Sequence, residues 1–285
     1  MKLFTFSSLK VFFCILLCFF IWSPYLASAN KLILYTDNDS YGSTNQEKIW
    51  YIAFGDPALA KFLDLKVPTQ FFLLDPTGKK NKIVLMREEL FDPWFNQKRI
   101  AYKTKLMVRE QGDYLLCIEG DEFLVGRGKI IKPLAKAVFH VEQELNWDGL
   151  CGFELEIKVF TRPYGLPVGA LFWGQVLYQG EPLNQGEVEV ERLRLKLNPQ
   201  TLLKDSTGAV NLPLYKKTTK LDQRGYFLVN FEEEGWWVIT VRLPRGVKTF
   251  GNQNYPFELQ SHLWLYVYPF ESKKKPKSPR KKISN

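Results

Sequence analysis

The sequence predicts an all-β protein with two immunoglobulin-like or transthyretin-like β-sandwich domains. Short apolar or alternating runs recur along its 285 residues, and clusters of glycine, proline, asparagine and aspartate separate them. Helical periodicity is scarce, and a hydrophobic content of 46% is ample for packed cores. Runs spaced by such turn signals are typical of β-sandwiches.

The first 29 residues predict a cleavable export signal. Lys2 and Lys10 supply a positive start, Val11–Ile21 an apolar core, and Ala27-Ser28-Ala29 a small-residue end. This three-part pattern is that of a secretory signal peptide. Pro24 interrupts the apolar stretch before it reaches the roughly 20 residues of a membrane-spanning helix. We therefore expect cleavage after Ala29 and a periplasmic or extracellular protein.

Residues 30–146 are expected to form the N-terminal sandwich. Turn residues such as Asp75-Pro76-Thr77-Gly78 separate its candidate strands. Arg87–Asn96 is compatible with a turn of helix, which Pro93 limits. Asn146–Gly152 is the expected boundary between the domains. The candidate strands are Lys31–Tyr35, Lys48–Phe54, Gln70–Leu74, Lys82–Leu85, Ala101–Val108, Asp113–Glu119 and Ala137–Leu145.

Residues 147–271 are expected to form the C-terminal sandwich. Asp222-Gln223-Arg224-Gly225 is a strong turn signal, and Lys196–Lys217 is polar and loop-like. Trp236 and Trp237 point to opposite faces of one strand, so we expect only one of them to fill a core. The candidate strands are Glu154–Phe160, Leu171–Tyr178, Val188–Leu193, Tyr226–Phe231, Trp236–Leu243 and Leu263–Val267.

The positive charge of the protein lies outside its predicted folded body. The sequence holds 39 lysine and arginine residues against 30 aspartate and glutamate residues, a formal net charge of +9. Two of the cations lie in the export signal and seven in residues 272–285, which leaves 30 basic and 30 acidic residues in residues 30–271. A nucleic-acid-binding domain needs a basic face to neutralise phosphates. The neutral body therefore argues against nucleic acid as a partner.

Residues 272–285 are expected to be a disordered basic tail. Pro276 and Pro279 interrupt a run of like charges that cannot fold alone. One interpretation is a solubilising end. The other is attachment to an anionic membrane or envelope surface, to which each nearby cation contributes about 1 kcal/mol before screening. The candidate surface-binding residues are Lys273, Lys274, Lys275, Lys277, Arg280, Lys281 and Lys282.

Two cysteines, Cys117 and Cys151, remain after removal of the signal. In an oxidising compartment such a pair can form a disulfide. The other interpretation is two small buried hydrophobic side chains, because geometry decides whether two cysteines pair.

No catalytic constellation stands out in the sequence. It contains no G-x-S-x-G elbow, no HExxH metal motif and no glycine-rich phosphate loop. We therefore expect a protein that is not an enzyme.

Several spaced motifs mark the second half of the chain: Trp147-Asp148-Gly149-Leu150, Thr161-Arg162-Pro163-Tyr164-Gly165-Leu166, Gly180-Glu181-Pro182-Leu183 and Gly235-Trp236-Trp237. In this order they resemble the centre of a bacterial periplasmic family of uncertain biochemistry associated with nickel and cobalt uptake. The resemblance covers residues 147–267 and, more loosely, 31–75. It implies two β-sandwich domains, a binding or accessory role in metal uptake, and a membrane transporter as partner.

The resemblance also implies metal ligands, several of which differ here. Asn30 stands where family members typically carry a histidine, and Asp56-Pro57 stands in the place of a His-Pro pair. Nickel and cobalt favour imidazole nitrogen, whereas oxygen suits Mg²⁺, Ca²⁺ or Mn²⁺ better. Asp37, at a position that the family also fills with aspartate, and Asp56 are the candidate oxygen ligands for a divalent metal ion.

His140 is the third candidate metal ligand. On a strand it shares one face with Glu142 and Glu144, because side chains alternate. Residues two apart lie ~6.8 Å from each other, so the three cannot easily reach one ion. A solvated polar face is the plainer interpretation of this pattern.

Two functions follow from these observations. The first is a periplasmic binding or accessory protein of a transition-metal uptake system, with altered or lost metal binding. The second is a non-catalytic structural or adhesion-type module of the cell envelope, in which the sandwiches contact a partner and the tail contacts a charged surface.

Overall fold

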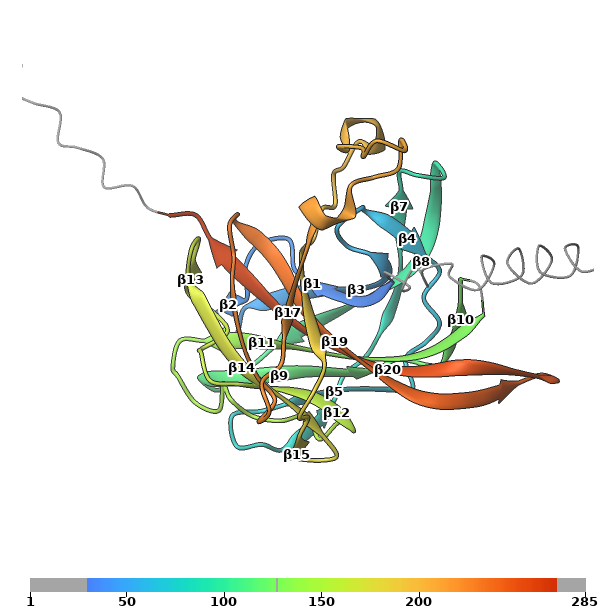
Figure 1. Ribbon diagram of the computed structural model, residues 1–285. Coiled ribbons are helices and arrows are strands. Elements are labelled where there is room, and N and C mark those ends of the chain that lie inside the picture. The colour runs from blue at the N-terminus through green and yellow to red at the C-terminus, as the bar shows by residue number, and fades with distance from the viewer. Residues whose placement is uncertain (1–29, 127, 271–285) are drawn as a thin grey trace, which may run out of the picture.

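The computed structural model describes residues 30–126 and 128–270, and over these residues the strands form three sheets (Figure 1). One large sheet lies between two smaller ones, because its side chains contribute to a separate hydrophobic core on each face. The predicted all-β sandwich class is therefore confirmed.

The first small sheet is antiparallel and holds the start of the described chain. Its strands, in spatial order, are β1 (Lys31–Tyr35), β3 (Glu47–Asp56), β8 (Gln97–Met107) and β7 (Met86–Asp92), with β4 (Lys61–Leu63) paired to β3.

The large sheet combines strands from both halves of the chain. Its order is β17 (Lys216–Lys220), β16 (Glu187–Arg192), β19 (Gly235–Phe250), β20 (Gln253–Tyr268), β11 (Lys129–Val141), β9 (Gly112–Glu119), β5 (Gln70–Leu74) and β6 (Lys80–Lys82). Three short strands pair beside this path: β2 (Tyr41–Gly42) and β10 (Phe123–Val125) with β11, and β13 (Leu166–Pro167) with β20.

The second small sheet comes from the second half alone. It contains β12 (Leu155–Val159), β14 (Leu171–Tyr178) and β15 (Glu181–Pro182), with β18 (Tyr226–Asn230) paired to β14. Two short 3-10 helices, Pro199–Thr201 and Leu212–Leu214, lie in the loop between β16 and β17.

The parallel pairing of β11 with β20 joins the two predicted domains, 30–146 and 147–271, through one sheet. Ala137 lies opposite Trp264 in this pairing. Each small sheet nevertheless packs on its own core. The division into two domains at residue 146 stays a prediction.

Both tryptophans of the Trp236-Trp237 pair are buried, so the expectation that only one fills a core is wrong. Trp236 belongs to the core under the first small sheet, and Trp237 belongs to the core under the second. Side chains alternate along β19 as predicted, but the strand is covered on both faces.

Several predicted elements differ in the structure. Arg87–Asn96 is not a helical turn, because β7 runs through it and its side chains alternate in burial before a turn leads into β8. The predicted strand Lys82–Leu85 is displaced, since β6 ends at Lys82. The last two strands are longer than predicted and form a long hairpin, with Pro244 paired to Glu258 (Figure 1). Other predicted strands, such as Gln70–Leu74, keep their bounds.

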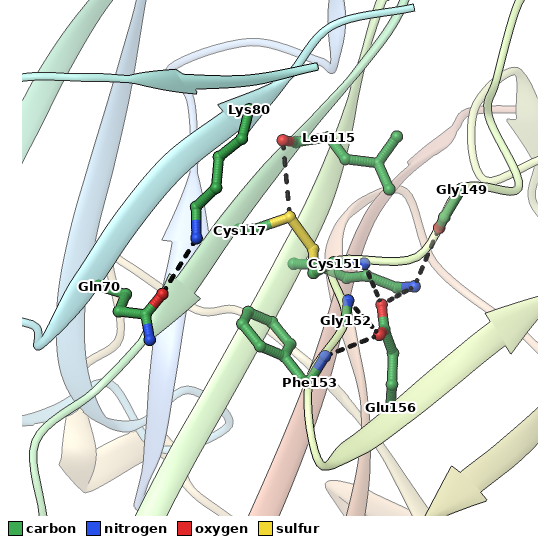
Figure 2. The surroundings of a disulfide bond; sticks show 10 residues. Gln70, Lys80, Leu115, Cys117, Gly149, Cys151, Gly152, Phe153 and Glu156 are labelled. Atoms are coloured by element: carbon green, nitrogen blue, oxygen red, sulfur yellow. Dashed lines mark hydrogen bonds and ion pairs between the residues drawn. A yellow bond between two sulfur atoms is a disulfide. The ribbon is translucent and has the colours of Figure 1, made fainter. Parts of the chain in front are cut away.

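A disulfide joins Cys117 on β9 to Cys151 in the loop before β12, with the Cα atoms 5.8 Å apart. Figure 2 shows how Glu156 holds this loop. Its carboxylate accepts the backbone N–H groups of Cys151, Gly152 and Phe153 at 2.7, 3.0 and 3.2 Å. The sequence left two interpretations of this cysteine pair open, and the structure shows the disulfide.

Candidate functional site

Asp37 follows β1 and borders a hollow of about 350 Å³ on the first small sheet. Tyr51 donates its hydroxyl to Asp37 Oδ2 at 3.1 Å, and Glu88 lines the same hollow. Burial, and after it the charges of nearby acidic groups including Asp37 and Glu88, raises the pKa of Tyr35. The hollow therefore combines carboxylate and phenol oxygens with apolar side chains, and Lys103 pairs with Glu88 at its edge.

Asp56 ends β3 and has a structural set of partners. Its Oδ1 accepts the backbone N–H groups of Ala58 and Leu59 at 3.1 and 3.2 Å. Its Oδ2 lies 3.2 Å from Lys216 Nζ on β17. Asp56 thus fixes a turn and pairs with a cation from the other half of the chain.

His140 lies near the end of β11 in a buried cluster with Asp113. Its Nδ1 is 2.7 Å from Asp113 Oδ1, while Asp113 Oδ2 accepts the Tyr164 hydroxyl at 3.1 Å and the Leu145 N–H at 2.7 Å. The imidazole stacks on the Tyr164 ring, with 4.1 Å between centroids, and Tyr41 meets it edge-on. Burial, followed by the Asp113 charge, raises the pKa of the Tyr164 phenol. The Asp113 carboxylate therefore holds the ring in one orientation.

The predicted common face of His140, Glu142 and Glu144 is wrong. β11 ends at Val141, and Glu142 has a positive φ of 62°, so the chain leaves the strand there. Glu142 then accepts the Thr44 N–H at 3.1 Å, and Glu144 pairs with Arg162. The two glutamates stabilise loops and do not extend the polar face of a strand.

The structure gives Asp37, Asp56 and His140 three separate sets of partners. Across residues 30–126 and 128–270, no group of three or more histidine, cysteine, aspartate and glutamate side chains is placed to hold a metal ion. Their assignment as metal ligands stays a prediction.

A buried charge cluster joins the start of β1 to the large sheet. Lys31 Nζ lies 2.5 Å from Glu191 Oε1, and both side chains are fully buried. Glu189 pairs with both Lys31 and Arg242, and Lys216 lies 3.5 Å from Glu191 Oε1. The full cluster comprises Lys31, Asp56, Lys129, Glu189, Glu191, Lys216, Arg242 and Glu258.

His262 lies beside this buried charge cluster. Its Nδ1 is 3.1 Å from the Thr240 hydroxyl. Complete burial, and after it the positive charges of Lys31 and Arg242, lowers its pKa well below the ordinary value. Burial likewise lowers the pKa of Lys31 to about 8. In the sequence, the two glutamates of the buried charge cluster lie in the alternating run Val188-Glu189-Val190-Glu191. Such a run ordinarily indicates a strand with one solvated face.

The outer face of the second small sheet carries an exposed apolar surface. Trp173 on β14 lies directly opposite Leu228 on β18, and they are 47% and 54% exposed. Leu171, two residues before Trp173, is 61% exposed. Phe160 and Tyr226 are partly exposed. We call these five residues the aromatic platform.

The rings of the aromatic platform contact one another. The Trp173 centroid lies 5.0 Å from that of Phe160 and 5.5 Å from that of Tyr226. The alternate residues of the same strands, such as Phe172 and Phe227, are buried in the core below. An antiparallel sheet usually turns a polar face to solvent, so an apolar outer face of this kind is unusual.

The described chain ends close to the aromatic platform. Val168 donates its N–H to the Tyr268 carbonyl at 2.9 Å, and three residues later Leu171 begins β14. Phe270, the last described residue, is 73% exposed. Figure 1 shows this red end of the chain beside β13. The predicted export signal and basic tail lie outside the described residues, within which no helix is long and apolar enough to cross a membrane.

The sequence profile of one protein family, described as "Domain of unknown function (DUF4198)", matches residues 27–245. The chain belongs to this family. The matched residues include the aromatic platform and most of both cores, whereas β20, which adds residues such as Trp264 and Leu263 to the cores, lies beyond the match. The family is uncharacterised, and its description names no metal. No curated protein matches the sequence at a significant level.

Solved structures show only a distant likeness. Salmonella alpha-2-macroglobulin reacted with methylamine is 13% identical, with 84% of this chain and 15% of that chain covered and a TM-score of 0.27. The native conformation of E. coli alpha-2-macroglobulin is also 13% identical over 84% of this chain and 14% of that chain, with a TM-score of 0.24. A marsupial T cell receptor is 8% identical over 88% and 75% of the two chains, with a TM-score of 0.21. This chain therefore spans about one seventh of the macroglobulins, and we draw no functional argument from them.

Proposed function

We propose that this protein is a non-catalytic binding module of the cell envelope, which contacts its partner through the aromatic platform. The observation that carries the proposal is the pairing of Trp173 with Leu228 on a solvent-facing sheet, about half exposed each. Exposed aromatic side chains that lie together are characteristic of interaction surfaces. The disulfide and the sheet shared by both halves supply a rigid support for this surface.

The proposal is tested by sedimentation of the mature protein with isolated bacterial envelopes. We expect Leu228→Ser to weaken binding, because it removes apolar surface from the centre of the aromatic platform. Leu203→Ser is a matched control, since Leu203 is also exposed (61%) but lies in the loop between β16 and β17. Equal binding by the wild-type protein and L228S would exclude this function.

A second candidate function is the binding of a metal ion for an uptake system, as the resemblance to the nickel and cobalt family suggests. It rests on the hollow beside Asp37, whose wall also holds the Tyr51 hydroxyl and Glu88, the latter paired with Lys103. Such a donor set favours hard cations over nickel. The ion would then be cargo passed to a membrane transporter.

Calorimetric titration of the mature protein with Ni²⁺, Co²⁺, Zn²⁺, Ca²⁺ and Mn²⁺ tests this second function. We expect binding of a hard cation that Asp37→Asn abolishes and Asp64→Asn leaves unchanged, because Asp64 lies outside the hollow. If no metal produces heat or changes the melting temperature, the metal-binding function is wrong.

A further inference from the structure

The aromatic platform places apolar rings beside uncharged hydrogen-bonding groups, and this mixture indicates the class of its partner. We infer that the aromatic platform binds an uncharged glycan chain of the cell envelope, with a pyranose ring of that chain seated on Trp173. This inference rests on the proposed function and names its partner. It uses only residues of the second small sheet and its flanking turns.

The three rings of the aromatic platform form one compact apolar surface. The Phe160 centroid lies 5.5 Å from that of Tyr226, and both lie within 5.5 Å of Trp173. A pyranose ring is similar in size to the benzene ring of an indole, and one of its faces carries mainly C–H groups. The negative face of an aromatic ring attracts such hydrogens. Trp173, which is 47% exposed, therefore offers a surface that matches one sugar ring.

Uncharged polar side chains lie beside this apolar surface. Asn230 shares the outer face of β18 with Leu228 and Tyr226, because side chains alternate along a strand. Asn230 is exposed and lies directly opposite Leu171, which makes it the diagonal neighbour of Trp173. Diagonal neighbours lie about 7–8 Å apart, a spacing that a sugar ring with its hydroxyls can bridge.

The hydrogen-bonding capacity of these side chains matches that of a sugar. The carboxamide of Asn230 both donates and accepts hydrogen bonds, and so does the phenol of Tyr226. A sugar hydroxyl also does both. The two side chains can therefore bond the hydroxyls at the edge of a ring whose C–H face contacts Trp173.

The charged residues around the aromatic platform are of both signs. Lys158 Nζ lies 5.4 Å from the Phe160 ring centroid, and Arg224 is exposed in the turn before β18. Asp222 is exposed in the same turn, and three exposed glutamates, residues 232–234, follow the strand. A strongly anionic or cationic partner would meet like charges on this rim, which is unfavourable. An uncharged partner does not.

The acidic residues of the rim also have contacts within the protein. Asp222 Oδ1 accepts the backbone N–H groups of Arg224 and Tyr226 at 2.8 Å each. Glu232 pairs with Lys217 at 2.6 Å, on the side of the large sheet. A cationic partner would have to compete with these contacts, whereas a glycan would not.

The size of the aromatic platform favours a glycan over a protein. A stable interface between two proteins takes about 20–30 residues from each side. The aromatic platform is far smaller than that. A glycan chain contacts a protein along a few sugar rings, so a small surface is sufficient, and the repeated rings of one polymer raise the effective concentration of the ligand.

Calorimetric titration of the mature protein, residues 30–285, with soluble hexasaccharides tests the inference. The probes are hexasaccharides of N-acetylglucosamine, of β-1,4-linked glucose and of α-1,4-linked glucose, which share the pyranose ring and differ in linkage and acetamido group. We expect at least one of them to bind, with an affinity that is unchanged from low salt to ~0.5 M salt because no ion pair forms.

Variants of the aromatic platform identify the surface that binds. We expect Trp173→Ala to weaken glycan binding at least about tenfold, and Trp173→Phe, which keeps an aromatic ring, to retain most of it. Asn230→Ala should weaken binding about fivefold through the lost hydrogen bond. Phe250→Ala is the matched control, because Phe250 is 49% exposed but lies in the long hairpin of β19 and β20. Circular dichroism and thermal unfolding confirm that each variant is folded.

Each outcome supports or overturns the inference. It is overturned if none of the hexasaccharides binds, if W173A and F250A lose binding equally, or if salt abolishes the binding. A dimer that L228S dissociates, or binding to lipid vesicles in place of glycans, also overturns it and identifies a second copy or a membrane as the occupant. If L228S loses envelope binding while no glycan is bound, the proposed function stands and its partner is not a glycan.

Discussion

Lys31 Nζ lies 2.5 Å from Glu191 Oε1, and this fully buried ion pair joins β1 of the first small sheet to β16 of the large sheet. The two residues are separated by 160 positions in the chain. Removing water from two charges is costly, and their attraction compensates for it only while both partners are present. The pair therefore makes the packing of the two sheets depend on both halves of the sequence.

Replacement of Lys31 alone should be strongly destabilising. We expect Lys31→Met to reduce the free energy of unfolding by about 3–5 kcal/mol, because Glu191 is left buried without its close partner and keeps a longer ion pair with Lys216 at 3.5 Å. Urea unfolding followed by fluorescence measures this change. The double variant K31M/E191L should recover much of the loss, and a single variant as stable as the wild-type protein would contradict the prediction.

Stability should fall in mild acid because of His262. Burial lowers the pKa of His262 well below its ordinary value, so the folded protein keeps this ring neutral. As pH falls below about 6.5, His262 binds a proton in the unfolded chain but stays neutral in the folded chain. The free energy of unfolding therefore decreases by up to about 1.4 kcal/mol per pH unit. His262→Gln should reduce this slope between pH 7 and pH 5. An identical slope in wild-type and H262Q proteins would refute the assignment.

The disulfide should contribute substantially to stability. The bond between Cys117 and Cys151 closes a loop with a sequence separation of 34. A loop of this length predicts a loss of about 2–4 kcal/mol in the double variant C117A/C151A, measured by denaturant unfolding. Reduction of the wild-type protein should lower its stability similarly, while the double variant should be insensitive to reductant.

Asp113 should be more sensitive to substitution than an exposed aspartate. Its carboxylate receives hydrogen bonds from Tyr164 and Leu145 and orients His140. The asparagine side chain has one oxygen that can accept a hydrogen bond, and its NH₂ group would face a second donor. Asp113→Asn should therefore reduce the free energy of unfolding by about 1–3 kcal/mol. Asp121→Asn is the control, because Asp121 is partly exposed and pairs only with Lys66 among the described ion pairs. Equal effects of the two substitutions would show that the Asp113 cluster contributes little.

The strands of the second half were predictable because their alternation and turn residues are local. The run Leu171–Tyr178 gives β14 with the predicted bounds, and Asp222–Gly225 forms the expected turn before β18. The strand in region 87–96 was not predictable from local pattern. β7 owes its strand conformation to pairing with β8, in which Met86 lies opposite Lys103. Pairing of this kind is tertiary information that a local pattern does not carry.

The candidate site was predictable only in part. His140 was singled out as a chemically distinctive residue, but its partner Asp113 lies 27 residues away and was not foreseen. The residues of the aromatic platform looked like ordinary strand residues, because alternation shows which side chains share a face and does not show which face is covered. The buried charge cluster was concealed for the same reason.

The sequence by itself determined the all-β class, the neutral body with its appended basic tail, and most strand positions, because composition and alternation act over a few residues. Tertiary structure alone decided that the large sheet is covered on both faces, which buries Trp236 and Trp237 together and turns Trp173 to solvent. It also decided that Cys117 meets Cys151 and that Lys31 meets Glu191. These contacts depend on how distant strands pack, and burial is a property of that packing rather than of any single run of residues.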